Sequence, residues 1–195
     1  MSLAGKRIGT AMTGSHCTLD IIVPQLVLLK QAGAALFPIL SPAVQNTDTR
    51  FGPAAEWIAK VVAVTGEEPW LTITDVEPIG PGKLLDLLLI APCTGNTMAK
   101  LANGVVDSVV LMAAKAQLRN SRPVLLFIST NDGLGLNAVN LATLLNTKNI
   151  YMVPFNQDNP VEKPNSLVSK PEMILPALEE ALCGRQIQPV IATGI

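Results

Sequence analysis

The chain has 195 residues, of which 49% are hydrophobic and 15% are charged, and its 14 basic residues nearly balance 15 acidic ones. This composition excludes an intrinsically disordered protein and gives no basic surface for nucleic acid. No run of 18 residues is apolar enough to cross a membrane, and no secretory signal follows Lys6 and Arg7. We therefore expect a cytoplasmic protein with a single domain over 1–195, whose sparse charge favours a homo-oligomer.

Apolar periodicity predicts strands and helices that alternate along the chain. In chain order it predicts a strand at 6–13, a helix at 18–32, a strand at 34–40, a helix at 53–65, a strand at 86–91, a helix at 98–112, a strand at 123–129, a helix at 136–146, a strand at 150–154 and a helix at 171–183. Thr18 is expected to cap the first helix, and apolar positions at helical spacing predict one continuous helix over 98–112. The residues after 184 are expected to be loose.

This alternation predicts an α/β protein with three layers, in which helices cover both faces of a mainly parallel, Rossmann-like sheet of about six strands. The core of the domain is expected at about 5–155, and the helix at 171–183 follows it. Ligands in such folds bind at the carboxyl ends of the strands, so the loops that follow strands are the candidate sites.

Two of these loops place small polar side chains at the start of a helix. Gly14 and Ser15 follow the first strand, where free backbone N–H groups favour an anion, although an ordinary helix cap would also explain them. The loop after 86–91 has more polar side chains than a cap needs, which favours a polar ligand. They are Thr94, Asn96 and Thr97. Cys93 precedes them, either as a thiol activated by the helix or, as the absence of a neighbouring base favours, as a buried structural residue.

A third loop supports a competing hypothesis, a nicotinamide nucleotide site. The residues from Gly133 to Ala138 match a Gly-x-Gly-x-x-Ala pattern between a strand and a helix, and Asp158 lies about 20 residues further on. The pattern has low specificity, and in dinucleotide-binding folds it normally opens the first βαβ unit rather than a late one.

The cysteines and the histidine restrict the chemistry further. Cys17, Cys93 and Cys183 are far apart, with no Cys-x-x-Cys pair, so we predict neither a disulfide framework nor a metal site. A Ser-His-Asp triad would require His16, and the sequence has no Gly-x-Ser-x-Gly turn to hold its nucleophile.

The segment from Ala91 to Ser108, APCTGNTMAKLANGVVDS, resembles the "PASANT" segment of the flavin-containing cysteine decarboxylase and flavin prenyltransferase superfamily. The resemblance implies a homo-oligomeric flavoprotein fold that binds FMN, with Gly14 and Ser15 in the phosphate loop and Ser41 as a second phosphate contact. The FMN-binding residues implied are Gly14, Ser15, Ser41, Pro92, Thr94, Asn96 and Thr97. Asn131, the surviving residue of the superfamily's substrate clamp, and Cys93 are the candidate substrate contacts.

Two departures from that superfamily affect the expected reaction. The histidine that its cysteine decarboxylases use after the second strand is missing, because His16 is the last histidine of the chain. Their substrate clamp, PxMNxxMW, keeps only its asparagine here, as Asn131. Oxidative decarboxylation of a peptidyl cysteine is therefore not expected.

Over its whole length the chain resembles the B-subunit family of dipicolinate synthases, through its GSHCT, PCTGNT and NDGLGLNA stretches. This resemblance implies an oxidoreductase that dehydrogenates dihydrodipicolinate with NADP as acceptor, an A subunit as partner, and the cytoplasm of a sporulating mother cell. Candidate partners for the substrate dicarboxylate are Arg50, Lys100 and Arg119, although a solvated surface charge would also explain each of them. His16 is the candidate proton acceptor, with a hydrogen bond to a backbone carbonyl as the alternative. Two alternatives remain, a non-catalytic binding subunit and a distinct FMN-dependent, decarboxylase-like enzyme.

Overall fold

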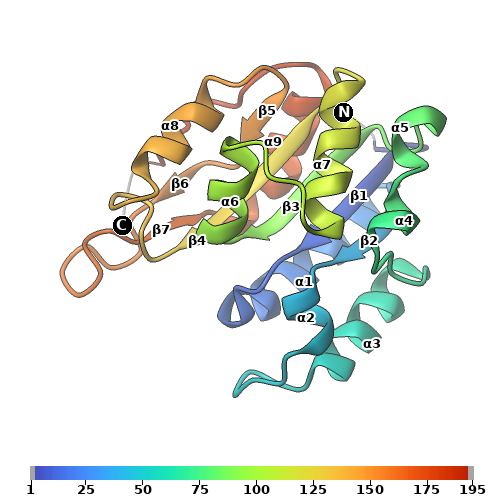
Figure 1. Cartoon of the computed structure of the whole chain (residues 1–195), viewed down its shortest axis with the longest axis horizontal. Coiled ribbons are helices and arrows are strands. Elements are labelled where there is room, and N and C mark those ends of the chain that lie inside the picture. Colours follow the sequence, from blue (N-terminus) through green and yellow to red (C-terminus); the bar gives the residue numbers. More distant parts are fainter. Residues whose placement is uncertain (1–2, 193–195) are drawn as a thin grey trace.

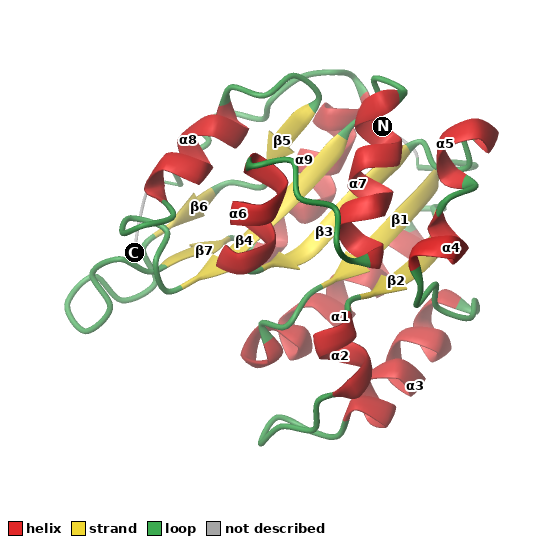
Figure 2. Ribbon diagram, in the orientation of Figure 1, coloured by secondary structure: helices red, strands yellow, loops and turns green. Residues whose placement is uncertain are grey.

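One seven-stranded sheet organises the part of the chain that the computed structural model describes, residues 3–192 (Figures 1 and 2). Its strands are β1 (Arg7–Met12), β2 (Ala35–Leu40), β3 (Leu87–Cys93), β4 (Val124–Thr130), β5 (Ile150–Met152), β6 (Phe155–Asn156) and β7 (Leu167–Ser169). The order is β2-β1-β3-β4-β7-β6, and β5 pairs with the first half of β4. The pairs of β1 to β5 are parallel, whereas β7 runs antiparallel to both β4 and β6. The mainly parallel sheet is thus confirmed.

Helices cover both faces of the sheet, so the three-layer prediction is also confirmed (Figure 1). The helices are α1 (His16–Gln31), α2 (Pro42–Asn46), α3 (Ala54–Thr65), α4 (Ile73–Val76), α5 (Ile79–Gly82), α6 (Gly95–Ala102), α7 (Val109–Arg119), α8 (Ala138–Leu145) and α9 (Ile174–Leu182). One core packs α1, α3 and α9 against the sheet, and a second core packs α4 to α8 on the opposite face.

β3 explains why the sequence needs a continuous apolar run at its centre. Leu87 and Leu89 point into the core under α1 and α9, while Leu88 and Ile90 point into the core under α7. Successive side chains of a strand face opposite sides, and both sides of β3 are covered, so every position must be apolar.

The helix predicted over 98–112 is two helices, and the single-helix prediction was wrong. α6 ends at Ala102, because Gly104 adopts a left-handed φ of +70°. α7 then starts anew, with the Ser108 hydroxyl accepting a hydrogen bond from the Leu111 N–H. The apolar spacing continues across the break because both helices pack on the same core.

The structure corrects two other boundaries. Ser15, not Thr18, is the N-cap of α1, and Thr18 is buried inside the helix. The described part of the segment after 184 is held in place rather than loose. Gln186 Oε1 accepts the Met152 N–H at 2.7 Å, and the Ala192 N–H donates to the Phe155 carbonyl at 2.9 Å.

Candidate functional site

A cavity of about 400 Å³ lies where β1, β2 and β3 end, at the carboxyl edge of the sheet. Most of the predicted FMN contacts line it, together with residues of α6 and α7. Its lining residues are Thr13, Gly14, Ser41, Pro42, Ala43, Thr94, Asn96, Thr97, Lys100, Asp107, Ser108 and Leu111. Three loops that are 25 or more residues apart in sequence therefore meet at one place. We refer to it as the loop cavity.

The N-terminus of α1 is open to an anion. Its N-cap Ser15 makes no capping hydrogen bond, and the first turn contains no acidic residue. Backbone N–H groups at the start of this 16-residue helix therefore keep their partial positive charge uncompensated. Gly14 brings the turn close to α2, because a Cβ at this position would lie 2.9 Å from the Ala43 Cβ.

Ser41 supplies a buried hydroxyl that lacks a partner within the described residues. The residue is only 7% exposed, it lines the loop cavity, and its Oγ makes no hydrogen bond. An unsatisfied buried polar group costs about 1–3 kcal/mol. A ligand acceptor in the cavity, such as a phosphate oxygen, would relieve this cost.

The start of α6 is capped, in contrast to α1. Thr94 Oγ1 accepts the Thr97 N–H at 3.3 Å and donates to Thr97 Oγ1 at 3.0 Å. The Asn96 side chain takes no part in the cap and is exposed at the cavity. The structure thus assigns Thr94 to local geometry and leaves the Asn96 amide free to face a ligand.

Of the three candidate cations, only Lys100 lines the loop cavity, and it is paired with Asp107 at 2.5 Å. Arg50 lies over the Phe51 ring, 4.8 Å from its centroid. Arg119 packs against Gly80, on the face of the sheet that α7 covers.

Ser15 and Asn131 lie in a neighbouring hollow of about 330 Å³ rather than in the loop cavity itself. The Ser15 hydroxyl bonds to those of Thr18 and Ser129, at 3.0 and 2.8 Å, and Thr18 and Ser129 are 2.9 Å apart. This hydroxyl triangle fixes the start of α1 to the end of β4. We refer to the hollow as the β4 hollow.

Two further predicted site residues, His16 and Pro92, line neither the loop cavity nor the β4 hollow. His16 opens α1, with its Nδ1 buried and without a hydrogen-bond partner in the described chain. The Pro92 carbonyl accepts hydrogen bonds from both the N–H and the hydroxyl of Thr13, at 3.2 and 2.7 Å, so Pro92 supports the cavity from behind.

Cys93 is fully buried in the core and lines neither cavity. Burial raises the pKa of its thiol to about 12, so the thiol stays protonated at neutral pH. Cys93 is therefore a core residue, which agrees with the favoured interpretation of a buried structural cysteine and not with the alternative of a substrate contact.

Gly133, the first glycine of the pattern that suggested a nicotinamide site, has a packing role. A Cβ on Gly133 would lie 2.7 Å from a Leu167 methyl, so the turn before α8 can approach β7 only with glycine. Asp158, the acidic residue noted about 20 residues beyond that pattern, lies in the β4 hollow and faces Lys163 at 3.9 Å.

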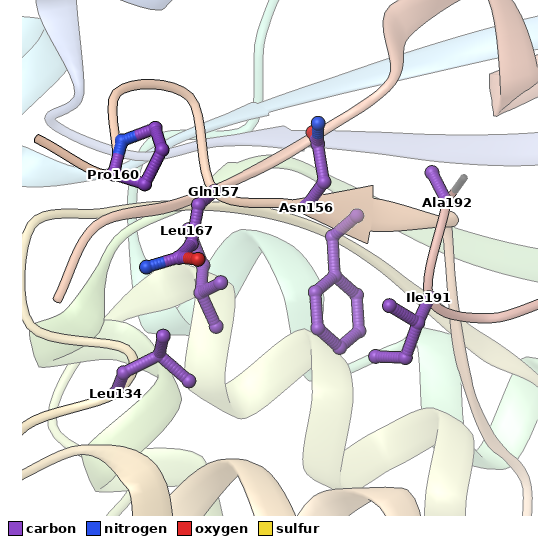
Figure 3. A pocket seen from close by; sticks show the side chains of 8 residues that line it. Leu134, Asn156, Gln157, Pro160, Leu167, Ile191 and Ala192 are labelled. Atoms are coloured by element: carbon purple, nitrogen blue, oxygen red, sulfur yellow. The ribbon is translucent and has the colours of Figure 1, made fainter. Parts of the chain in front are cut away.

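A third cavity, of about 330 Å³, lies beside β6 and β7 (Figure 3). Leu134, Leu167 and Ile191 point toward it from three separate segments, with the amide of Gln157 nearby. It contains no predicted site residue. Within residues 3–192, no cluster of three or more metal-binding side chains occurs, and no helix is long and apolar enough to span a bilayer.

Sequence reasoning missed Thr13 and Ser108 as cavity residues. Thr13 could have been found from its place between the first strand and Gly14. Ser108 closes the segment that carries the family resemblance, but its role as the cap of α7 was hidden by the prediction of one long helix.

Comparisons with known proteins identify the family of the chain. The Flavoprotein family model matches residues 1–179. The dipicolinate synthase B subunit of Bacillus subtilis (strain 168) is 52% identical over 190 residues, which are 97% of this chain and 95% of that protein. The crystal structure of the dipicolinate synthase B subunit from Bacillus halodurans C matches with a TM-score of 0.92 and 49% identity, covering 100% of both chains. The FMN-dependent cysteine decarboxylase SpaF shares the fold, with a TM-score of 0.68 at 18% identity over 93% of this chain and 97% of that one. The chain therefore belongs to the Flavoprotein family.

Proposed function

We propose that this chain is the flavin-binding subunit of a two-subunit dehydrogenase that oxidises dihydrodipicolinate to dipicolinate. The similarity to the B subunits of two dipicolinate synthases supports the proposal, because a B subunit implies an A-type partner. In this proposal NADP reaches the complex through the partner, the chain forms a homo-oligomer, and the reaction takes place in the cytoplasm of a sporulating mother cell.

The observation that carries the flavin proposal is the unpartnered hydroxyl of Ser41 in the loop cavity. It lies in the same cavity as Gly14, which precedes the open N-terminus of α1, so a hydroxyl donor and backbone N–H groups are available for one phosphate. Asn96 and Thr97 would contact the remainder of the FMN at the start of α6.

Bound FMN would supply a two-electron acceptor, and the chain has to position the substrate and accept a proton. Dihydrodipicolinate loses a hydride and a proton and becomes aromatic. His16 is our candidate for the proton acceptor, since its buried Nδ1 has no partner among the described residues and its Nε2 would lie 3.7 Å from a Cβ on Gly14. Asn131 is the candidate substrate contact at the end of β4.

The first experiment titrates FMN into the purified protein and compares Ser41→Ala with Ser108→Ala. Ser41→Ala is expected to weaken FMN binding about tenfold, the effect of one good hydrogen bond to a charged group. It should leave the FMN-free protein as stable or slightly more stable, because an unsatisfied hydroxyl is removed. Ser108→Ala should instead lower stability by about 1 kcal/mol through the lost cap of α7.

A second variant tests the sign of the charge at the site. Ser15→Asp places a carboxylate at the N-terminus of α1, where it would repel a phosphate, so FMN binding should be strongly reduced. If the wild-type protein binds no FMN even with its partner subunit present, the flavin proposal is wrong.

Turnover of dihydrodipicolinate, measured with and without the partner, then separates a catalytic from a non-catalytic subunit. The non-catalytic alternative is favoured by one observation, the loss of all but Asn131 from the superfamily's substrate clamp. A His16→Gln variant gives a direct comparison: if it binds FMN normally but its turnover no longer depends on pH as that of the wild type does, a catalytic role for this chain is supported.

A further inference from the structure

The β4 hollow is assembled from four separate parts of the chain and has several polar side chains in its wall. The start of α1, the end of β4, the loop after β6 and the start of β7 all contribute to its wall. Three of its hydroxyl residues are more than nine-tenths buried, Thr18, Ser129 and Ser166. The hollow is therefore part of the folded body of the protein and not a gap between mobile loops.

The hollow adjoins the proposed flavin site through two direct links. Ser15 in the hollow follows Gly14 in the loop cavity, and both belong to one turn. On the other side, a Cβ on Gly95, at the start of α6, would lie 2.5 Å from Thr130 Oγ1, which lines the hollow. A small molecule in the β4 hollow would thus lie beside a ligand bound in the loop cavity.

The described wall of the hollow contains one cation, whose ammonium can reach an anion. Of its described lining residues, Lys163 is the cation and Asp158 the anion, and their closest charged atoms are 3.9 Å apart. This distance fits an ion pair but is too long for a hydrogen bond, so the Lys163 ammonium still has N–H donors to offer. The Asn131 amide, also in the wall, is exposed and offers further donors.

We propose that the β4 hollow binds a carboxylate group of the substrate, an aromatic or dihydroaromatic dicarboxylate, with Lys163 as its anchor and Asp158 as a competitor for that anchor. This inference rests on the proposed function, which supplies the class of substrate. Lys163 forms a charge-assisted contact with the carboxylate, and Asn131 donates from the end of β4. Asp158 opposes binding, because its own carboxylate faces the same ammonium.

The competitor role predicts opposite effects for two neutral substitutions in one ion pair. Lys163→Gln removes the anchor and should weaken binding, whereas Asp158→Asn removes the rival carboxylate and should strengthen it. A general disturbance of the loop would weaken binding in both variants. The side chains are 54% and 34% exposed, so neither substitution should unfold the protein.

The test is calorimetric titration of pyridine-2,6-dicarboxylate into the FMN-loaded full-length protein, in metal-free buffer at low salt. We expect Lys163→Gln to weaken binding about tenfold, Lys163→Arg to change it by less than about threefold, and Asp158→Asn to tighten it about threefold. Lys148→Gln is the matched control, an exposed lysine just before β5, at the opposite edge of the sheet, and it should leave binding unchanged.

Binding that weakens with added salt and follows these opposite signs would support the inference. Equal affinity of Lys163→Gln and wild type, or weaker binding by Asp158→Asn, would overturn it. FMN loading is measured first, so that a failure of the flavin site can be distinguished from a failure of the β4 hollow. A protein that binds FMN but not the dicarboxylate refutes the β4 hollow alone, whereas a protein that binds no FMN refutes the proposed flavin site.

Discussion

Gly95 is the position where a single added methyl group should disturb the candidate site most. Its Cβ would lie 2.5 Å from Thr130 Oγ1, 2.7 Å from Asp132 Oδ1 and 2.9 Å from Asn137 Nδ2. These three atoms belong to one network, in which the Asp132 carboxylate accepts hydrogen bonds from the Thr130 hydroxyl and, at 2.7 Å, from Asn137. No side-chain carbon can approach so closely, so the network has to move by about half an ångström (3.0 − 2.5 Å).

The expected cost follows from the contacts that must change. Overpacking typically costs about 1–3 kcal/mol, and weakening a hydrogen bond to a charged carboxylate adds about 1.5 kcal/mol. Alanine at the start of α6 regains at most about 1 kcal/mol through helix propensity. We therefore expect Gly95→Ala to lower the free energy of unfolding by about 2 kcal/mol, which lowers Tm by about 4–8 °C in a domain of this size.

Urea unfolding at fixed protein concentration measures this loss, and two comparisons identify its cause. In an Asp132→Ala background the neighbours can retreat, so Gly95→Ala should cost about 1 kcal/mol less there. Gly104→Ala is the control for backbone strain, because Gly104 has a φ of +70° and open space around it. Its cost should be the same in both backgrounds. A Gly95→Ala cost that Asp132→Ala leaves unchanged would refute the steric reasoning.

The cysteines and the amino edge of the sheet provide two more predictions. Cys17 and Cys183 are exposed, whereas burial raises the pKa of Cys93 to about 12, so a thiol reagent at pH 8 should label two cysteines per native chain and three after denaturation. Burial opposes the charged form of Asp86, but hydrogen bonds and charge from Arg7 outweigh it and lower its pKa below 3.8. A carboxylate with a lowered pKa stabilises the fold at pH values above its unfolded-state pKa, and this stabilisation is lost as the pH falls. Asp86→Asn should therefore lower the free energy of unfolding by about 1–2 kcal/mol at pH 7. It should also make the loss of stability between about pH 5 and pH 2 less steep. Parallel stability curves for the two proteins would contradict the second prediction.

The parallel sheet and the position of the site were predictable because local sequence determines them. The residues of β3 are apolar on both faces, which only a doubly covered strand requires, and polar residues follow immediately after it. Since parallel strands end at one edge, the loops at Gly14, Ser41 and Thr94 had to converge. The structure shows that convergence in the loop cavity.

The remaining features depend on contacts between distant segments. A periodic apolar pattern does not show that a chain turns at Gly104 and restarts at Ser108, because both helices face the same core. The strands β6 and β7 have two and three residues, too few for a periodic signal, and β7 is held by the buried Ser169 hydroxyl, which bonds to the Ile128 N–H and the Val153 carbonyl. The β4 hollow depends on this hairpin, so sequence reasoning could place Asn131 but not its neighbours Asp158 and Lys163.

The two helix N-termini beside the loop cavity differ, and this difference explains how one site can hold a charged group of a ligand at one helix and an uncharged group at the other. At the start of α6, the Thr94 side chain caps a backbone N–H group, and the Asp132 carboxylate packed against Gly95 compensates the positive end of the helix dipole. A further anion would therefore be repelled there. The start of α1 has neither a side-chain cap nor an acidic residue in its first turn, and the buried Ser41 hydroxyl shares its cavity. A phosphate should therefore bind between α1 and α2, and the uncharged part of the ligand should lie along α6. This asymmetry is a property of the chain itself, because the same residues that complete one helix end leave the other one incomplete.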